Sequence, residues 1–212
     1  MPGTITRSPD LLPSATDLRD AYNLELQAAD GHPVRFGDLV LEKGEITTII
    51  VFVRHFFCVY DQSYVRTMTH HLTESVLQTV PHAPGPTQLI IIGCGDPSLI
   101  VPYVNETGAA ECPVYSDPDG KLYEKLHMRR TVAGIMNQPV YSEVGFWRSL
   151  GMTIRQIWGK GWKGLRGGRW DQNGGEWIMR DGKVEFVHRM ETVDDHLTAE
   201  ELLEIMDCTG KE

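Results

Sequence analysis

The sequence is poor in cysteine and in basic residues, and it contains no long hydrophobic run. Four cysteines among 212 residues are too few and too scattered for the disulfide framework of a small secreted protein, so we expect a reducing, cytoplasmic setting. Acidic residues outnumber basic ones by 29 to 20, for a net charge of −9, which disfavours a general nucleic-acid binder. No apolar stretch is long enough to cross a bilayer or to serve as a secretory leader, so no membrane span is expected.

Hydrophobic residues make up 41% of the chain, which is enough for one sizeable core. We therefore predict a single domain over residues 21–212, preceded by an extension over residues 1–20. Alternating apolar residues on both sides of an Asp-Gly turn predict a β-hairpin over residues 23–36. The apolar run at 46–53, broken only by two threonines, predicts a central strand covered on both faces.

Strands and helices alternate along the middle of the chain. Apolar residues recur at helical spacing over residues 63–80, and the prolines that follow end this predicted helix. A second buried strand is predicted at 89–93, a helix at 97–106 and a short strand at 113–115. Two strand–helix steps in succession indicate a largely parallel sheet.

The C-terminal part predicts a second hairpin and a final helix. An Arg-Asp-Gly turn separates predicted strands at 176–179 and 183–187, and a Thr-x-x-Glu capping box opens a helix at 198–206. This order of elements predicts an α/β, thioredoxin-like fold in which helices flank a mixed central sheet. An N-terminal β-hairpin precedes that core, and a long insertion over 128–175 separates it from the last hairpin.

Cys58 follows the carboxyl end of the 46–53 strand and precedes the next helix, where open α/β sheets bind their ligands. The unpaired N–H groups and the dipole at the start of that helix favour a thiolate. Arg54 is placed to stabilise the same anion, and His55 to move a proton. We therefore interpret Cys58 as a nucleophilic or redox cysteine, with a buried structural cysteine as the alternative.

The run that ends at Cys58 resembles a family signature. It reads Val-Phe-Val-Arg-His-Phe-Phe-Cys and is followed by Asp61. This is similar to the Arg-His-x-x-Cys-x-x-Cys segment of the peroxiredoxin-like family of alkyl hydroperoxide reductase/thiol-specific antioxidant (AhpC/TSA) type. The resemblance covers roughly residues 23–206. Further matching segments follow in the family's order: Gly93 to Pro97, Val114 to Pro118, Lys121 to Tyr123, Gly174-Gly175 and Val193 to His196.

The resemblance implies a thioredoxin-like fold and a thiol oxidoreductase with no bound cofactor. In the family, the first cysteine attacks a peroxide oxygen, becomes a sulfenic acid and is returned to the thiol through a second cysteine. Substrates include hydroperoxides and, for one relative, an endoperoxide. The resemblance implies that Cys58 is the reacting cysteine, and we predict His55, Arg54 and Asp61 as the other catalytic residues. Because Asp61 replaces the second cysteine, resolution requires an external thiol such as thioredoxin or glutathione, or another cysteine of the chain: Cys94, Cys112 or Cys208.

Two departures from the family change the expected chemistry. Val51 and His55 stand where mainstream peroxiredoxins carry proline and threonine, so a peroxide is not held in the usual way. A carboxylate at Asp61, on the same helical turn as Cys58, raises the pKa of the thiol. Asp61 has three interpretations: part of a slower one-cysteine reductase, an acid/base partner of His55 and Cys58 in a non-redox reaction, or a helix cap.

The other three cysteines are weaker candidates. Cys94 ends a buried strand at the same sheet edge as Cys58, where packing is the commoner role. Cys112 lies near a strand start, and Cys208 lies in the last turn before a tail. We predict packing roles for them, although the position of Cys208 near a chain end would suit a resolving thiol.

Residues 155–175 combine glycines, basic residues and tryptophans. The composition resembles that of segments that stack on bases or lie on membranes. A loop or amphipathic helix packed over the sheet is the simpler interpretation. A sharper one is a pocket wall above Cys58 that binds an anionic substrate, with Trp158, Trp162, Trp170 and Arg169 as the substrate-binding residues.

No metal site is predicted, because His70 and His71 diverge on a helix, while His188 and His196 are separated by polar chain and expected to be solvated. Three functions stay open. The first is a peroxiredoxin-like thiol oxidoreductase acting through Cys58 on a peroxidic or anionic small organic metabolite. The second is a non-redox isomerase, lyase or cyclase, and the third is a binding module without catalysis. No nucleic-acid partner is expected, and a homodimer is compatible with the sequence.

Overall fold

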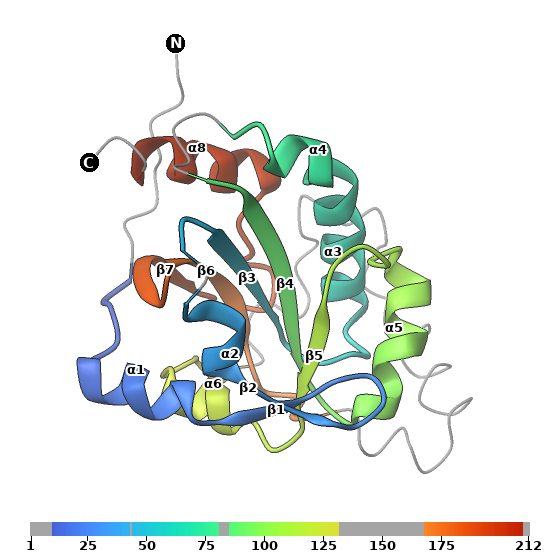
Figure 1. Cartoon of the computed structure of the whole chain (residues 1–212). Helices are drawn as coiled ribbons and strands as arrows, with labels where there is room; N and C mark the ends of the chain where they lie inside the picture. The colour runs from blue at the N-terminus through green and yellow to red at the C-terminus, as the bar shows by residue number, and fades with distance from the viewer. Residues whose placement is uncertain (1–9, 43, 81–84, 132–167, 210–212) are drawn as a thin grey trace.

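The computed structural model describes residues 10–42, 44–80, 85–131 and 168–209. Strands in these residues form a seven-stranded sheet in the order β2-β1-β5-β4-β3-β6-β7, which Figure 1 shows with helices packed around it. The strands are β1 (Glu25–Gln27), β2 (Pro33–Arg35), β3 (Thr47–Val53), β4 (Thr87–Cys94), β5 (Val114–Asp117), β6 (Gly175–Arg180) and β7 (Lys183–Arg189).

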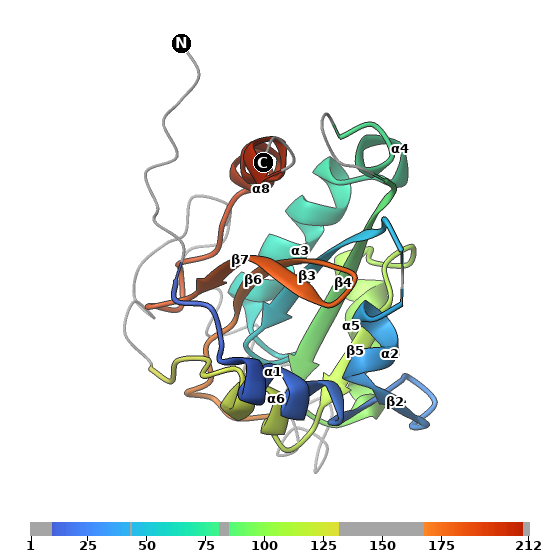
Figure 2. The ribbon, with the colours of Figure 1, turned by 60° about the vertical axis from the view of Figure 1, so that its left-hand side comes forward.

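Helices cover both faces of the sheet (Figure 2). One face packs against α3, α4, α5 and α8, and the other face packs against α1, α2 and α6. Each face forms a hydrophobic core with its helices. Their bounds are α1 (Ala15–Tyr22), α2 (Phe36–Val40), α3 (Val59–His71), α4 (Glu74–Leu77), α5 (Ile100–Thr107), α6 (Lys121–Lys125) and α8 (Ala199–Thr209), with a 3-10 turn, η1 (Pro97–Leu99), before α5.

The sheet is mixed, and only its middle is parallel. Strand β4 pairs in parallel with both β3 and β5, whereas the β1–β2, β1–β5, β3–β6 and β6–β7 pairings are antiparallel. The expectation of a largely parallel sheet is therefore wrong. The two hairpins add antiparallel strands on both sides of the β-α-β-α-β unit, which the local pattern of that unit does not reveal.

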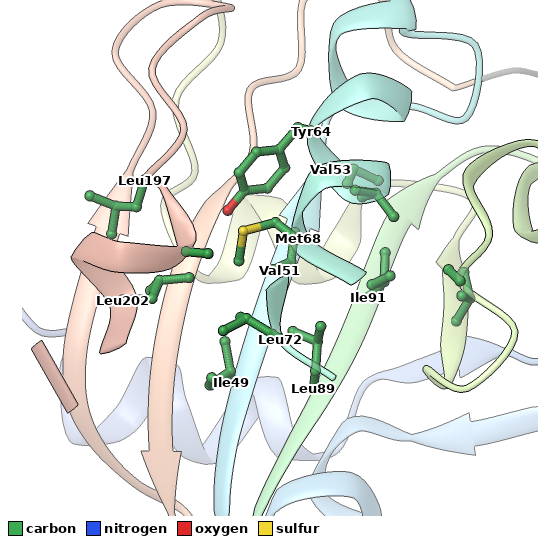
Figure 3. Packing of buried hydrophobic residues seen from close by; sticks show 14 of the residues in the cluster. Ile49, Val51, Val53, Tyr64, Met68, Leu72, Leu89, Ile91, Leu197 and Leu202 are labelled. Atoms are coloured by element: carbon green, nitrogen blue, oxygen red, sulfur yellow. The ribbon is translucent and has the colours of Figure 1, made fainter. Parts of the chain in front are cut away.

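Strand β3 divides its side chains between two cores. Ile49, Val51 and Val53 face the α3 side, and Ile50 and Phe52 face the other, all at 1% exposure or less. Figure 3 shows the α3 side, where β3 and β4 residues meet Tyr64 and Met68 of α3 and Leu202 of α8. The prediction of a strand covered on both faces is confirmed.

Several helix boundaries differ from those expected. The single helix predicted at 63–80 is two helices, α3 and α4, because Thr73 starts a new helix by accepting a hydrogen bond from Val76 N with its side chain. Helices α2 and α6 were not predicted, since five residues are too few to show a helical period. Helix α1 was also missed, although Ser14 caps it through the Asp17 N–H.

The turn and cap signals at the C-terminal end are confirmed. Asp181 and Gly182 adopt φ of 46° and 78°, as a tight turn between two antiparallel strands requires. Thr198 N donates to Glu201 Oε2 at 2.8 Å, and Glu201 N donates to Thr198 Oγ1 at 3.2 Å. This reciprocal pair is the expected capping box.

Candidate functional site

Cys58 lies at the start of α3, at the carboxyl edge of the parallel strands. Strand β3 ends at Val53, and Cys58 is the N-cap residue of α3. Its side chain is 5% exposed. The strand–helix order therefore brings the sulfur to the sheet edge where this fold class places ligands.

The guanidinium of Arg54 is fixed against this sulfur. Arg54 Nη1 lies 3.4 Å from Cys58 Sγ, while Nε donates to Gln172 O at 3.1 Å and Nη2 donates to Trp170 O at 2.8 Å. The two carbonyls belong to the segment that enters β6. This segment therefore holds the cation in place, and Arg54 and Cys58 are brought together as the sequence predicted.

Asp61 joins the end of β3 to α3. Its carboxylate accepts the Arg54 backbone N–H at 2.5 Å and pairs with His196 Nε2 at 3.5 Å. The side chain is fully buried. Burial alone would raise the pKa of Asp61, but the imidazolium of His196 and the guanidinium of Arg54 outweigh it and hold that pKa below its usual value.

The surroundings of Cys58 oppose ionisation of the resting thiol. Burial raises its pKa, the Asp61 carboxylate adds to this, and Arg54 offsets only part, so that the pKa is about 12. The helix position and Arg54 were expected to favour a thiolate, but burial and Asp61 prevail over them. Cys58 is therefore a thiol at neutral pH.

His55 is buried beside Trp170. The two ring centroids lie 4.6 Å apart, and Trp170 is 47% exposed while His55 is 2% exposed. Among the described residues, His55 Nδ1 has no hydrogen-bond partner. Burial, with a smaller contribution from Arg54, lowers the pKa of His55 to about 3. The ring is therefore neutral, and one of its nitrogen atoms is buried without a hydrogen bond to any described residue.

Glu176 binds two histidines beneath α3. The antiparallel register sets Glu176 of β6 opposite Val51 of β3, whose side chain faces α3. Glu176 Oε2 contacts His188 Nδ1 at 2.7 Å, and Oε1 contacts His196 Nδ1 at 2.5 Å. Asp195 lies 3.4 Å from His188 Nε2. These groups form a buried network that extends to Asp61.

Both histidines of the network are cationic at neutral pH. Burial lowers the pKa of each, but carboxylates outweigh it: Asp195 and Glu176 raise the pKa of His188 to about 9, and Glu176 and Asp61 do the same for His196. Burial raises the pKa of Glu176, yet the two imidazolium groups lower it to about 2. The expectation that His188 and His196 are solvated is wrong, since they are 8% and 3% exposed.

A period of two along β6 and β7 is the signal that would have found this network. Glu176 stands two residues before Ile178, and His188 two residues after Phe186, and both of these apolar residues belong to the α3-side core. Residues two apart in a strand share a face. The polar side chains of Glu176 and His188 suggested that both residues are exposed to solvent. The alternation of side chains along the strands instead places them on the buried face.

The network predicts a stability maximum in mildly acidic solution. Glu176, with a pKa lowered from 4.5 to about 2, stabilises the fold above pH 4.5 and loses that contribution as the pH falls toward 2. His188 and His196, with pKa values raised from 6.5 to about 9, stabilise it below pH 6.5 and lose their contribution as the pH rises through 9.

We therefore expect urea unfolding to give a larger free energy at pH 6.5 than at pH 9. Replacing the exposed His32, which pairs with Asp30, with glutamine should leave this difference unchanged. A difference that persists in a His188→Gln/His196→Gln double variant would show that other groups cause it.

The remaining predicted residues are dispersed. All four cysteines are free thiols: Cys94 is buried at the end of β4, Cys112 is half-buried and Cys208 is exposed on α8. Burial raises the pKa of Cys94, and it raises that of Cys112 to about 11. Arg169 lines a cavity of about 730 Å3 together with Asp96, Asp117 and Lys121. Trp158 and Trp162 lie outside the described residues.

Metal-binding clusters and membrane-spanning helices are both absent from the described residues. In residues 10–42, 44–80, 85–131 and 168–209, no group of three or more His, Cys, Asp or Glu side chains is arranged to hold a metal ion. Among the helices of these ranges, none combines the length and apolar character needed to cross a membrane.

Sequence comparisons match this chain to one family. The AhpC/TSA antioxidant enzyme family matches over residues 72–192. Peroxiredoxin-like 2C of Bos taurus is 30% identical over 188 residues, covering 84% of this chain and 74% of the relative. Peroxiredoxin-like 2C of Homo sapiens is 27% identical over 187 residues, covering 84% and 75%.

Solved structures of low sequence identity share the fold. Reduced Prx3 from Vibrio vulnificus in complex with hydrogen peroxide has a TM-score of 0.56 at 13% identity, with 95% of this chain and 99% of that chain covered. The bacterioferritin comigratory protein of Xanthomonas campestris has a TM-score of 0.57 at 11% identity, with 96% and 99% covered. Together with the family match, these likenesses show that the chain belongs to the AhpC/TSA antioxidant enzyme family and is a peroxiredoxin-like protein with a thioredoxin-like fold.

Proposed function

We propose that the protein is a thiol oxidoreductase that reduces a hydroperoxide or an endoperoxide through Cys58. The observation that carries this proposal is the contact of 3.4 Å between Arg54 Nη1 and Cys58 Sγ at the start of α3. A guanidinium at this distance stabilises negative charge on the sulfur and on a peroxide oxygen beside it. The family to which the chain belongs supports the same chemistry.

The proposed reaction with a hydroperoxide has two balanced steps. The Cys58 sulfur attacks one peroxide oxygen and the O–O bond breaks. The leaving alkoxide takes the proton released by the thiol, so that an alcohol and a Cys58 sulfenic acid result. An external thiol reductant, of thioredoxin or glutathione type, then attacks the sulfenic sulfur and releases water. A second thiol group restores Cys58 and leaves the reductant as a disulfide.

The surroundings of Cys58 suit a reducing cycle without a local disulfide. Asp61 occupies the position three residues after Cys58, where a second cysteine would otherwise act. His55 Nδ1 is buried without a hydrogen-bond partner in the part of the chain that the structure describes, and the O–H of a bound peroxide would donate the missing hydrogen bond. Trp170 packs against the His55 ring. Arg169 precedes Trp170 in the chain and lines a cavity with Asp96 and Asp117, and its positive charge is expected to attract an anionic substrate. We propose these two residues as substrate contacts.

A non-redox reaction is the second candidate function. The observation that favours it is the fully buried Asp61 carboxylate close to a neutral His55 and a protonated Cys58. Three groups of different proton affinity are the components of general acid/base catalysis on a small organic substrate. In this case Asp61, rather than Cys58, would be indispensable.

A sulfenic-acid trap tests the main proposal. After the full chain is exposed to hydrogen peroxide in the presence of dimedone, mass spectrometry should locate the adduct on Cys58. Cys94→Ser, Cys112→Ser and Cys208→Ser variants should label as the unmodified chain does, because none of these cysteines is needed for the first step. Labelling of the other cysteines with none at Cys58 would reject the proposal.

A further inference from the structure

His196 is held on three sides beneath the Cys58 end of α3. Its Nδ1 contacts Glu176 Oε1 at 2.5 Å, and its Nε2 faces Asp61 Oδ1 at 3.5 Å. Its ring stacks on Tyr64 with centroids 3.9 Å apart and planes 8° apart. Its side chain has no exposed surface. The ring is therefore held in place, with Nδ1 hydrogen-bonded to Glu176 and Nε2 in an ion pair with Asp61.

Asp61 interacts with both this ring and the Cys58 thiol. The titratable and charged groups that interact with its carboxylate are Arg54 and His55 from the β3–α3 connection, His196 from the segment before α8, Tyr103 from α5, Tyr123 from α6 and Cys94 from β4. Cys58 itself lies one helical turn earlier. Of the groups on this side of α3, His196 is the cation that pairs directly with an Asp61 oxygen. Its charge therefore decides how readily Asp61 accepts a proton.

The proton of Cys58 has two alternative sites. It resides on sulfur beside an ionised Asp61, or on Asp61 beside a thiolate, and the total charge is the same in both states. A cation against Asp61 favours the first state, because it stabilises the carboxylate. Without that cation the buried carboxylate is less stable in its ionised form, and an Asp61 that has become protonated no longer adds to the pKa of Cys58.

We propose that His196 is a positioning residue that holds Asp61 ionised and thereby keeps the proton of Cys58 on sulfur in the resting protein. This inference rests on the proposed function in one respect: it gives Cys58 a reason to be kept protonated. A protonated thiol reacts slowly with alkylating agents and oxidants, and it reacts with the substrate only when the proton leaves the sulfur. The protection itself is a property of the thiol and is measured without any peroxide.

The test is the rate at which iodoacetamide alkylates Cys58 at neutral pH, followed by mass spectrometry on the full chain. His196→Gln should raise this rate about tenfold or more, a tenfold change being equivalent to one pKa unit. Asp61→Asn should also raise it, since it removes the carboxylate. In the Asp61→Asn background, His196→Gln should produce no further change, because His196 acts through Asp61.

A matched control separates this effect from the loss of any histidine. His32 contacts Asp30 at 2.5 Å on the surface, with a side chain that is 60% exposed, and His32→Gln should leave the alkylation rate unchanged. An unchanged rate in His196→Gln would overturn the proposal. So would an equal increase with and without Asp61→Asn, because that result indicates general loosening of the fold.

A measurement on the unmodified chain covers the case in which His196→Gln does not fold. Nitrogen chemical shifts of the His196 ring, followed by NMR against pH, should show an imidazolium at neutral pH that loses its proton near pH 9. A neutral ring at pH 7 would overturn the inference. The variants could show the expected alkylation rates while the protein fails to reduce peroxide. That result would reject the proposed function and leave the role of His196 intact.

Discussion

Replacing Glu176 with glutamine should lower the free energy of unfolding by about 3–5 kcal/mol, the range found when one partner of a buried ion pair is removed. Glu176 has no exposed surface and contacts the imidazolium groups of His188 and His196. It also accepts the Leu197 N–H at 3.3 Å. The amide of glutamine carries no charge to offset the two imidazolium groups. Each ring must therefore lose a proton or remain as a buried cation that lacks one of its carboxylate partners.

The loss should appear as a lower midpoint of thermal unfolding. At about 2–4 °C per kcal/mol for a chain of this size, a decrease of roughly 6–20 °C is expected. Glu191→Gln is the matched control, because Glu191 pairs with Arg129 at the surface with a side chain that is 71% exposed. Surface pairs contribute about 0–1 kcal/mol. Equal effects of the two substitutions would show that the buried network does not stabilise the fold.

Cys58→Ser should reduce peroxide turnover to the uncatalysed background, whereas Asp61→Asn should sustain turnover at least as fast as the unmodified chain. Serine cannot form a sulfenic acid, so the first step is lost entirely. An asparagine oxygen can still accept the Arg54 N–H, but the negative charge that raises the pKa of Cys58 is gone. The measurement is peroxide consumption in the presence of excess glutathione or dithiothreitol.

The order of the two variants separates the two candidate functions. If Asp61→Asn abolishes activity toward an organic substrate while Cys58→Ser retains part of it, the non-redox function is favoured. Cys94→Ser is the control, because Cys94 is also buried near this sheet edge but has no contact with Arg54 among the described hydrogen bonds. It should turn over peroxide at the rate of the unmodified chain.

Local sequence was sufficient to locate Cys58. The apolar run of β3 and the helix after it are consecutive, so their junction follows from residues 46–72 alone. Arg54 and Asp61 belong to the same stretch, and the structure places both beside the cysteine. How these residues together set the pKa of the thiol was not predictable in the same way, because burial has the largest effect and depends on how distant segments pack around Cys58.

Residues far from Cys58 in the sequence complete the site, and the sequence around them did not indicate that they belong to it. Gln172 and Trp170 hold Arg54 through backbone carbonyls, which every residue type possesses. Glu176 reaches α3 only because β6 pairs with β3 in one register. Gly174 permits that approach, since a Cβ atom at this position would lie 1.8 Å from Phe52 O. Sequence alone shows the glycine pair but not its partner strand.

The position of β6 beside β3 also constrains how the chain folds during its synthesis. Strand β3 ends more than a hundred residues before its antiparallel neighbour β6 begins. Until that segment leaves the ribosome, β3 has an unpaired edge, and such an edge is prone to pair with other chains. The nascent chain is therefore expected to expose this edge until β6 has been made, and Arg54 beside Cys58 gains its two carbonyl partners, Trp170 O and Gln172 O, only at that stage.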